Sequence, residues 1–582
     1  MSEQSNESQS GNVGAIERGR ADLAAWERDR PRNYLETDPG FQQMLRMHLG
    51  EQLYRGHWPL LNRAAELAAG SMDRLARESN RDENLPRLSR FDGIGERVEE
   101  VVFHPTYHEL GAQIWSTGVL SVLAEPGNEL LCGVLAYFVA HNGEAGHACP
   151  VACTAGLIKL LQQVGSEEQR ARYLPRLLET DYGKRLHAAQ FVTEVQGGSD
   201  VGCNDCVAVP DPDRPGYYRI SGEKWFCSVM DAQLFVVTAR PEGASPGTGG
   251  LGLFLVPRCV DGQLNAFTIR RLKYKLGTRS MASGEADFHG ALAESIGLVH
   301  RGFKNLISIV LDTSRVHNAI AACATMRRAY VEARTFAAHR VAFDRAIIDH
   351  PMVRERLARM KVLTCAAVAT TFRILAVTDE LTRTDRDNED LLAARRTHVN
   401  INKYWTAIKC TQVVRDAIEV LGGNGTIEEF SVLPRLYRDA IVVESWEGTH
   451  NTLCAQVLRD FARRGMHRQW LAEMRSCVEA AGHDTLREHN ERASDLLREV
   501  TDRIDRLLAE GDDYASLHIR RVVDRMCLLS GYVSLLLELR WELEHKVRSD
   551  RAAVVDLYRL LYIDQVDPMD CTELASLCER VT

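Results

Sequence analysis

The sequence predicts a mainly helical α+β fold in which a compact all-β unit separates two helical regions. From Ala15 to about His187, runs such as ACTAGLIKLLQQ carry apolar residues at three- and four-residue steps, which is the period of an amphipathic helix. Between Ala188 and Phe288, short β-type runs such as LFVVTAR and LGLFLVP alternate with Gly, Pro and Asp clusters. Long amphipathic helices return after Gly302.

These changes of period divide the chain of 582 residues, a length that permits about two to four domains. The first dozen residues are nearly all Ser, Asn, Gln, Gly and Glu, which is typical of disorder. We expect a disordered tail at 1–14, an N-terminal helical domain at 15–187, a β domain at 188–300, a helical domain at 301–465 and a C-terminal helical extension at 466–582.

The composition is that of a globular protein, with 26% charged residues, 45% hydrophobic residues and a net charge of −9, which gives no reason to expect a polyanionic partner. No apolar run approaches the ~20 residues that span a bilayer, and the start lacks a secretory pattern, so we expect a cytoplasmic protein without a membrane partner. The 15 Cys are an odd, scattered set, which indicates reduced thiols. Cys203 and Cys206 form a CxxC that permits half a zinc site or a redox pair, but a plain loop is favoured and no metal is expected.

Two β-region motifs have both a functional and a structural interpretation. In QFVTEVQGGSDVG, residues 190–202, paired glycines allow a ligand to approach the backbone, and Thr and Ser hydroxyls suit phosphate or heterocycle oxygens. A plain turn is the alternative. In GEKWFCS, residues 222–228, an aromatic pair beside a Ser suits a planar redox ring, although local chemistry favours two core aromatics in a barrel.

Three helical-region motifs are equally open on local chemistry. EVLGGNGT, residues 419–426, is either a nucleotide-binding backbone or a helix C-cap and turn. The arginines of LDTSR and RVAF are either solvated or phosphate-binding. In ESWEGTHNTLCAQVLRD, residues 444–460, Glu447 is either a solvated turn residue or a base aimed at a substrate. No GxSxG, HExxH, P-loop or strand-associated GxGxxG motif supports the common hydrolase and nucleotide-hydrolysing classes.

Taken in order, TEVQGGSD, GEKWFCS, KLGTRSMASGEADF, LDTSR, RVAF, EVLGGNG and WEGT resemble the acyl-CoA dehydrogenase family over about residues 90–465. VVFHPTYHEL, PRLYRDA, WEGTHN and the helices after residue 465 look like the AidB-type branch of that family. The resemblance implies an N-terminal helical domain, a middle β-barrel and a C-terminal four-helix bundle, followed by the extra C-terminal helical domain of the branch.

The resemblance also implies FAD as the cofactor. Thr193 would lie near the flavin ring and Ser199 near the pyrophosphate, while Phe226 takes the place of a stacking Trp and Ser228 faces the flavin N5. Arg340, Phe343 and the 419–423 backbone would reach the FAD of a neighbouring subunit in a homodimer or homotetramer. The full implied FAD set is Phe191, Val192, Thr193, Gly198, Ser199, Phe226, Ser228, Arg340, Phe343, Glu419, Gly422, Gly423, Gly448, Thr449 and Asn451.

Glu447 falls on the family's catalytic glutamate, which removes the α-proton of an acyl thioester while the β-carbon delivers a hydride to flavin N5. Burial beside Trp446 and the substrate would raise the pKa of Glu447 and the following helix N-terminus would lower it, and we expect burial to dominate once substrate excludes water. Ser199, Asp312 and Arg315 are implied on the substrate side. The implied partners are an acyl-CoA or an acyl-carrier thioester and an electron-transfer flavoprotein or another acceptor.

Two positions depart from the family pattern, since Asp344 replaces the Gly of RxxFG and Trp225 shifts the aromatic position that Phe226 fills. The alternative function is that of an AidB-like alkylation-response flavoprotein with a DNA-associated role and weak dehydrogenase activity. From Phe461 onward the chain has 18 Lys and Arg against 23 Asp and Glu, so DNA binding is not favoured. An oxidase or monooxygenase ranks last, because such relatives usually lack the Glu.

Overall fold

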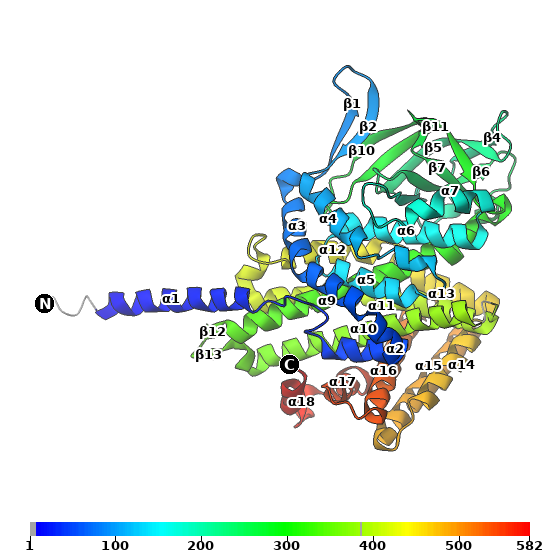
Figure 1. The fold of residues 1–582 in the computed structure, drawn as a ribbon. Helices are drawn as coiled ribbons and strands as arrows, with labels where there is room; N and C mark the ends of the chain where they lie inside the picture. The colour runs from blue at the N-terminus through cyan, green and yellow to red at the C-terminus, as the bar shows by residue number, and fades with distance from the viewer. Residues whose placement is uncertain (1–6, 385–386) are drawn as a thin grey trace.

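The computed structural model describes residues 7–384 and 387–582, and the described chain is mostly helical. In Figure 1 the barrel lies at one side of a central set of long helices, and the C-terminal helices lie at the other side. The predicted fold class is confirmed.

The N-terminal region contains α1 (Glu7–Arg28), α2 (Pro39–Ala69), α3 (Ser71–Ser79), α4 (Pro105–Ser116), α5 (Glu129–Ala140), α6 (Ala145–Val164) and α7 (Glu167–Leu177). Part of the segment predicted as a disordered tail, 1–14, is therefore helical from Glu7, and residues 1–6 lie outside the described residues. Polar residues extend a helix readily once it is formed, because each adds a hydrogen bond without a new nucleus.

A β-hairpin of β1 (Arg87–Phe91) and β2 (Arg97–Val102) interrupts this region, which the sequence predicted to be helical. Its turn is built by Asp92, whose carboxylate accepts the N–H groups of Ile94 and Glu96, and by Gly95 at φ 88°. Such side-chain-to-backbone bonds favour turns over helices.

The middle domain is a seven-stranded sheet in the order β10-β11-β5-β4-β6-β3, with β7 pairing β11 and β6. Its strands are β3 (Ala188–Phe191), β4 (Val207–Pro210), β5 (Tyr217–Ser228), β6 (Leu234–Pro241), β7 (Gly252–Pro257), β10 (Phe267–Leu272) and β11 (Ser283–Ser295). Phe191 stacks on Phe235 inside the barrel, with ring centroids 4.7 Å apart. Ser228 pairs with Ser283 across β5 and β11.

The central helices are α9 (Leu311–His339), α10 (Pro351–Arg383), α11 (Glu389–Leu421), α12 (Leu433–Ser445) and α13 (His450–Arg464). An 18-residue window of α10 has a mean hydropathy of 1.6, so by length and composition alone this helix departs from the expectation that no run is long enough to span a membrane. In the fold 78% of that window is buried, as is normal for a core helix of a bundle.

The C-terminal extension contains α14 (His467–Ala480), α15 (Arg487–Ala509), α16 (Asp512–Glu544), α17 (Arg551–Tyr558) and α18 (Leu574–Val581). Its core is continuous with the bundle, since Trp470 and Tyr532 share one buried cluster with Tyr404 of α11 and Val457 of α13. The His398 side chain of α11 also contacts Glu473 of α14 at 2.8 Å. The extension therefore packs against α11 and against α13, the helix that follows the WEGT turn.

Candidate active site

Glu447 lies on the tight turn between α12 and α13. Its φ is 58°, a left-handed conformation that costs a residue with a Cβ about 1 kcal/mol or more, and Gly448 follows at φ 106°. Trp446 packs against the barrel core and so ties this turn to the middle domain. Surrounding contacts must maintain such a backbone, and the neighbouring helices supply them.

Three side chains donate hydrogen bonds to carbonyl oxygens of this turn. Arg315 Nε of α9 lies 3.1 Å from the Glu447 oxygen, and Asn318 Nδ2 lies 3.2 Å from the Val443 oxygen. Lys403 Nζ of α11 lies 3.0 Å from the oxygen of Glu444 and 2.9 Å from that of Gly448. Both cations are buried. The backbone on both sides of the carboxylate is thereby fixed.

The Glu447 carboxylate itself is left free to react. Among the described residues, nothing donates a hydrogen bond to it or forms an ion pair with it. Burial raises its pKa, and Arg315 and Lys403 lower it by less, so the pKa lies above the ordinary glutamate value. A carboxyl with a raised pKa on this half-buried turn has the character of a proton acceptor. That burial outweighs the helix N-terminus once substrate excludes water stays a prediction.

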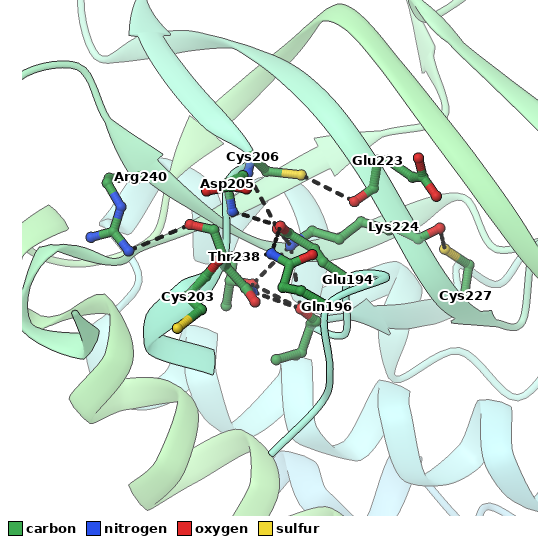
Figure 2. Close-up of polar contacts among 12 residues, drawn as sticks. Glu194, Gln196, Cys203, Asp205, Cys206, Glu223, Lys224, Cys227, Thr238 and Arg240 are labelled. Carbon is green, nitrogen blue, oxygen red and sulfur yellow. Dashed lines mark hydrogen bonds and ion pairs between the residues drawn. The ribbon is translucent and has the colours of Figure 1, made fainter. Parts of the chain in front are cut away.

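A buried ion pair organises the TEVQGGSD turn that follows β3 (Figure 2). Lys224 Nζ lies 2.6 Å from Glu194 Oε1, 3.1 Å from Thr238 Oγ1 and 3.3 Å from the Val192 oxygen. Glu194 also accepts the N–H of Asp205 at 2.6 Å. The start of the turn is therefore locked to β5 and β6.

The far part of this turn reaches the helices through hydroxyl groups. Ser199 Oγ lies 3.1 Å from Thr452 Oγ1 of α13, which lies 3.0 Å from Thr449 Oγ1. A Cβ on Gly198 would lie 2.8 Å from Thr193 Oγ1, so glycine is required for this close approach. The fold thus brings the predicted residues of the 193–199 turn and the WEGT turn together.

Aromatic and hydroxyl groups on β5 continue the same surface. Phe226 is 51% exposed, and Lys273 Nζ lies 4.8 Å from its ring centroid. Ser228 is half-buried, and its pairing partner Ser283 accepts a hydrogen bond of 2.9 Å from Lys275 Nζ. An accessible aromatic face, aligned hydroxyls and a glycine turn are the features that a flavin and its pyrophosphate need.

Comparisons with known proteins show the family of the chain. Three family models match consecutive segments: the Adaptive response protein AidB N-terminal domain at 27–184, the acyl-CoA dehydrogenase middle domain at 189–291 and the acyl-CoA dehydrogenase C-terminal domain at 300–462. Acyl-CoA dehydrogenase family member 11 of Caenorhabditis elegans is 32% identical to the chain, over 74% of the chain and 71% of its own length. The chain belongs to the acyl-CoA dehydrogenase family.

Further relatives of this acyl-CoA dehydrogenase family member confirm the AidB-type branch. The putative acyl-CoA dehydrogenase AidB of Escherichia coli strain K12 is 35% identical over 69% of the chain and 73% of its own length. The structure of C. elegans ACDH-11 in complex with C11-CoA has a TM-score of 0.82 at 26% identity and covers 91% of each chain. The Bd2924 apo-form has a TM-score of 0.79 at 27% identity, covering 88% of this chain and 98% of its own. The likeness therefore extends into the helices after residue 465.

A second group of predicted FAD residues lies far from Glu447 in the same chain. From Lys403 to Glu419, α11 advances 16 residues, which is about 24 Å, and Gly422 and Gly423 follow. Arg340 and Phe343 belong to the β12 (Val341–Ala342) and β13 (Arg345–Ala346) hairpin before α10, where Phe343 is 90% exposed. The 419–423 backbone therefore lies too far along α11 to contact Glu447 in the same subunit. The contact of this group with a neighbouring subunit's FAD stays a prediction.

The remaining predicted residues differ in their burial and in their hydrogen-bond or ion-pair partners. The Phe191 ring is buried in the barrel core, so a flavin contact at this residue would use its backbone atoms. The Val192 oxygen accepts hydrogen bonds from Lys224 and Asn204, so a flavin contact there would use atoms other than this oxygen. Asp312 pairs with Arg395 at 2.8 Å, whereas Arg315 contacts the base turn directly. Asn451 lies exposed in the first turn of α13.

Sequence reasoning missed Lys403. Its signal in the chain is weak, because a single Lys within HVNINKYW has no motif of its own. Within residues 7–384 and 387–582 there is no group of three or more His, Cys, Asp or Glu side chains that could hold a metal ion, and Cys203 donates its thiol hydrogen bond to Asp200 at 2.9 Å.

Proposed function

We propose that this acyl-CoA dehydrogenase family member oxidises an acyl-CoA, or an acyl-carrier thioester, to the 2,3-enoyl thioester, with Glu447 as the base that removes the α-proton. The observation that carries the proposal is the Glu447 carboxylate, which has a raised pKa and, in the described part of the chain, no hydrogen-bond or ion-pair partner. It lies on a turn whose backbone is held from both sides. A base that must accept a proton near neutral pH needs that environment.

The cofactor is FAD, which when bound would accept the hydride that leaves the β-carbon. The residues that would hold it are Phe226 and Ser228 on β5, the 193–199 turn, and Gly448, Thr449 and Asn451 at the start of α13. The hydroxyl row from Ser199 to Thr449 supports this assignment, because hydroxyls donate well to phosphate and ribityl oxygens.

An acyl-CoA substrate is supported by the similarity to ACDH-11, whose structure is a complex with C11-CoA. An electron-transfer flavoprotein or another acceptor would reoxidise the flavin. We expect a homodimer or homotetramer, because Phe343 and the 419–423 backbone would complete the FAD site of a neighbouring subunit. We also expect a cytoplasmic location.

The test is anaerobic titration of the FAD-loaded protein with a series of acyl-CoAs that includes C11-CoA, in the wild type and in Glu447→Gln. The variant should keep its flavin absorbance but lose bleaching by about 100-fold or more, since general bases contribute about 10² to 10⁴ in rate. Glu510→Gln, at the exposed end of α15, is the matched control and should bleach normally. Unchanged bleaching in Glu447→Gln would reject the assigned base.

A second candidate is an AidB-like alkylation-response flavoprotein with a DNA-associated role. It is supported by the match to the Adaptive response protein AidB N-terminal domain over residues 27–184. The acidic balance after residue 461 does not favour it.

A further inference from the structure

Lys403 is a buried lysine that has no ion-pair partner among the residues that the structure describes. It lies near the middle of α11 with an exposed fraction of 0%, and no carboxylate of the described residues lies within 4.0 Å of its Nζ. Its hydrogen-bond acceptors are two backbone oxygens. Unpaired buried charges are costly and rare in proteins, so this lysine calls for a functional reason.

The two oxygens that Lys403 contacts bracket the proposed base. The Glu444 oxygen, 3.0 Å from Nζ, belongs to the last turn of α12, and the Gly448 oxygen, 2.9 Å away, follows Glu447. The ammonium group thus serves as a C-terminal cap for α12, where the helix dipole favours a cation. It also joins both ends of a turn that holds Glu447 at a strained φ of 58°.

The charged groups around Lys403 leave Glu447 as its main electrostatic partner. Glu444 of α12 is engaged by Thr411 and by His450 of α13, whose Nε2 lies 2.9 Å from its carboxylate. Arg315 of α9 faces both groups, but its guanidinium bonds the Glu447 backbone oxygen and, at 2.7 Å, Asn400 Oδ1. Arg520 of α16 places a positive charge near His450, and the Cys153 thiol of α6 lies near Glu447.

The electrostatic coupling of the pair runs in both directions. Burial lowers the pKa of Lys403 to about 7, while the Glu447 carboxylate opposes that change. Burial raises the pKa of Glu447, while Arg315 and Lys403 oppose that change. Each charge therefore helps to keep the other ionised.

We propose that Lys403 is a positioning residue for the base: it fixes the turn of residues 444–448, and its positive charge keeps Glu447 ionised at lower pH than burial alone would allow. This inference rests on the proposed function for its catalytic meaning. The positioning and the charge coupling are properties of the folded chain and can be measured without turnover.

Two substitutions of Lys403 separate the positioning of the turn from the effect of the positive charge. Lys403→Met removes both the donor and the charge, whereas Lys403→Gln keeps an N–H donor and removes only the charge. Lys409→Met is the matched control, because Lys409 lies on the same helix but contacts Trp405 and Gln412 instead of the turn.

Hydrogen exchange measured by mass spectrometry tests the positioning. Peptides covering 444–451 should exchange about tenfold faster in Lys403→Met, less so in Lys403→Gln, and as in the wild type in Lys409→Met. Wild-type exchange of this peptide in Lys403→Met would overturn the positioning role. If Lys403→Met does not fold, Lys403→Gln decides, and unaltered exchange combined with an unaltered pH profile overturns the inference.

Two measurements test the charge. In the pH profile of flavin bleaching, the acidic limb should move to higher pH by about one unit in Lys403→Gln, and an unmoved limb would overturn the coupling. In thermal unfolding near pH 6, below the pKa of about 7 that burial gives Lys403, the Lys403→Gln/Glu447→Gln double variant should lose less stability than the two single variants together. Strict additivity would overturn the coupling as well. If none of the acyl-CoAs bleaches the flavin of the wild type, the proposed function fails. Hydrogen exchange and thermal unfolding then still decide the role of Lys403.

Discussion

Replacing Lys224 with Met tests whether the buried ion pair of Figure 2 holds the barrel turn in place. Lys224 is 0% exposed, and its Nζ lies 2.6 Å from Glu194 Oε1. Met fills a similar volume, so the main change is electrostatic. The Glu194 carboxylate would stay buried with the N–H of Asp205 but without its cation.

The expected cost follows from the groups that remain. Removing one partner of a buried pair typically costs about 3 to 5 kcal/mol, because the other charge stays desolvated. Asn204 Nδ2 still donates to the Val192 oxygen at 2.8 Å and to Thr238 Oγ1 at 3.2 Å, so those acceptors keep a partner. We therefore expect the lower end, a loss of about 3 kcal/mol in the free energy of unfolding at pH 7.

The pKa of Glu194 predicts how the stability lost in Lys224→Met changes with pH. Burial raises the pKa of Glu194, but Lys224 and the N–H donors lower it more, so it lies below its ordinary value. The stabilisation from a lowered pKa is fully present above the unfolded pKa of about 4.3 and is lost as pH falls through the folded pKa. The difference in the free energy of unfolding between wild type and Lys224→Met should therefore be largest at pH 7 and become smaller below about pH 4.

Urea unfolding followed by Trp fluorescence, with flavin absorbance to report FAD release, measures both consequences. Lys184→Met is the control, since its ion pair with Asp181 at 3.1 Å is exposed, and this variant should unfold at nearly the same urea concentration as the wild type. A Lys224→Met protein within about 1 kcal/mol of the wild type, with unaltered FAD affinity, would refute the reasoning.

Two further predictions concern the cofactor turn and nucleic acid. Gly198→Ala should weaken FAD binding about tenfold in a fluorescence titration, because its Cβ would lie 2.8 Å from Thr193 Oγ1 and an overpacked site must shift. Gly249→Ala, where a Cβ meets no atom within 4 Å, should bind FAD normally, and equal affinities for both variants would contradict the prediction. Duplex DNA should bind with a Kd above about 1 μM at physiological salt, and tight binding with a steep salt dependence would favour the alkylation-response role.

The sequence predicted the order of the domains and the motifs of the site because both depend on local signals. Hydrophobic period separates helix from strand over a few residues, and the ordered motifs carry the resemblance to the family. The hairpin of β1 and β2 and the helical start of α1 were missed. A turn built by one carboxylate and a helix extended through polar residues leave little trace in hydrophobic period.

The sequence by itself determined where the proposed base, the glycine turn and the aromatic strand lie along the chain. Only the tertiary structure decided how they meet. Ser199 reaches Thr452 across 253 residues, and Arg315 and Lys403 converge on the WEGT turn from two different helices. The pKa of Glu447 also depends on this packing, because it is set by burial and by charges that are distant in sequence. No local pattern encodes those distances, so the environment of the base is a property of the folded chain.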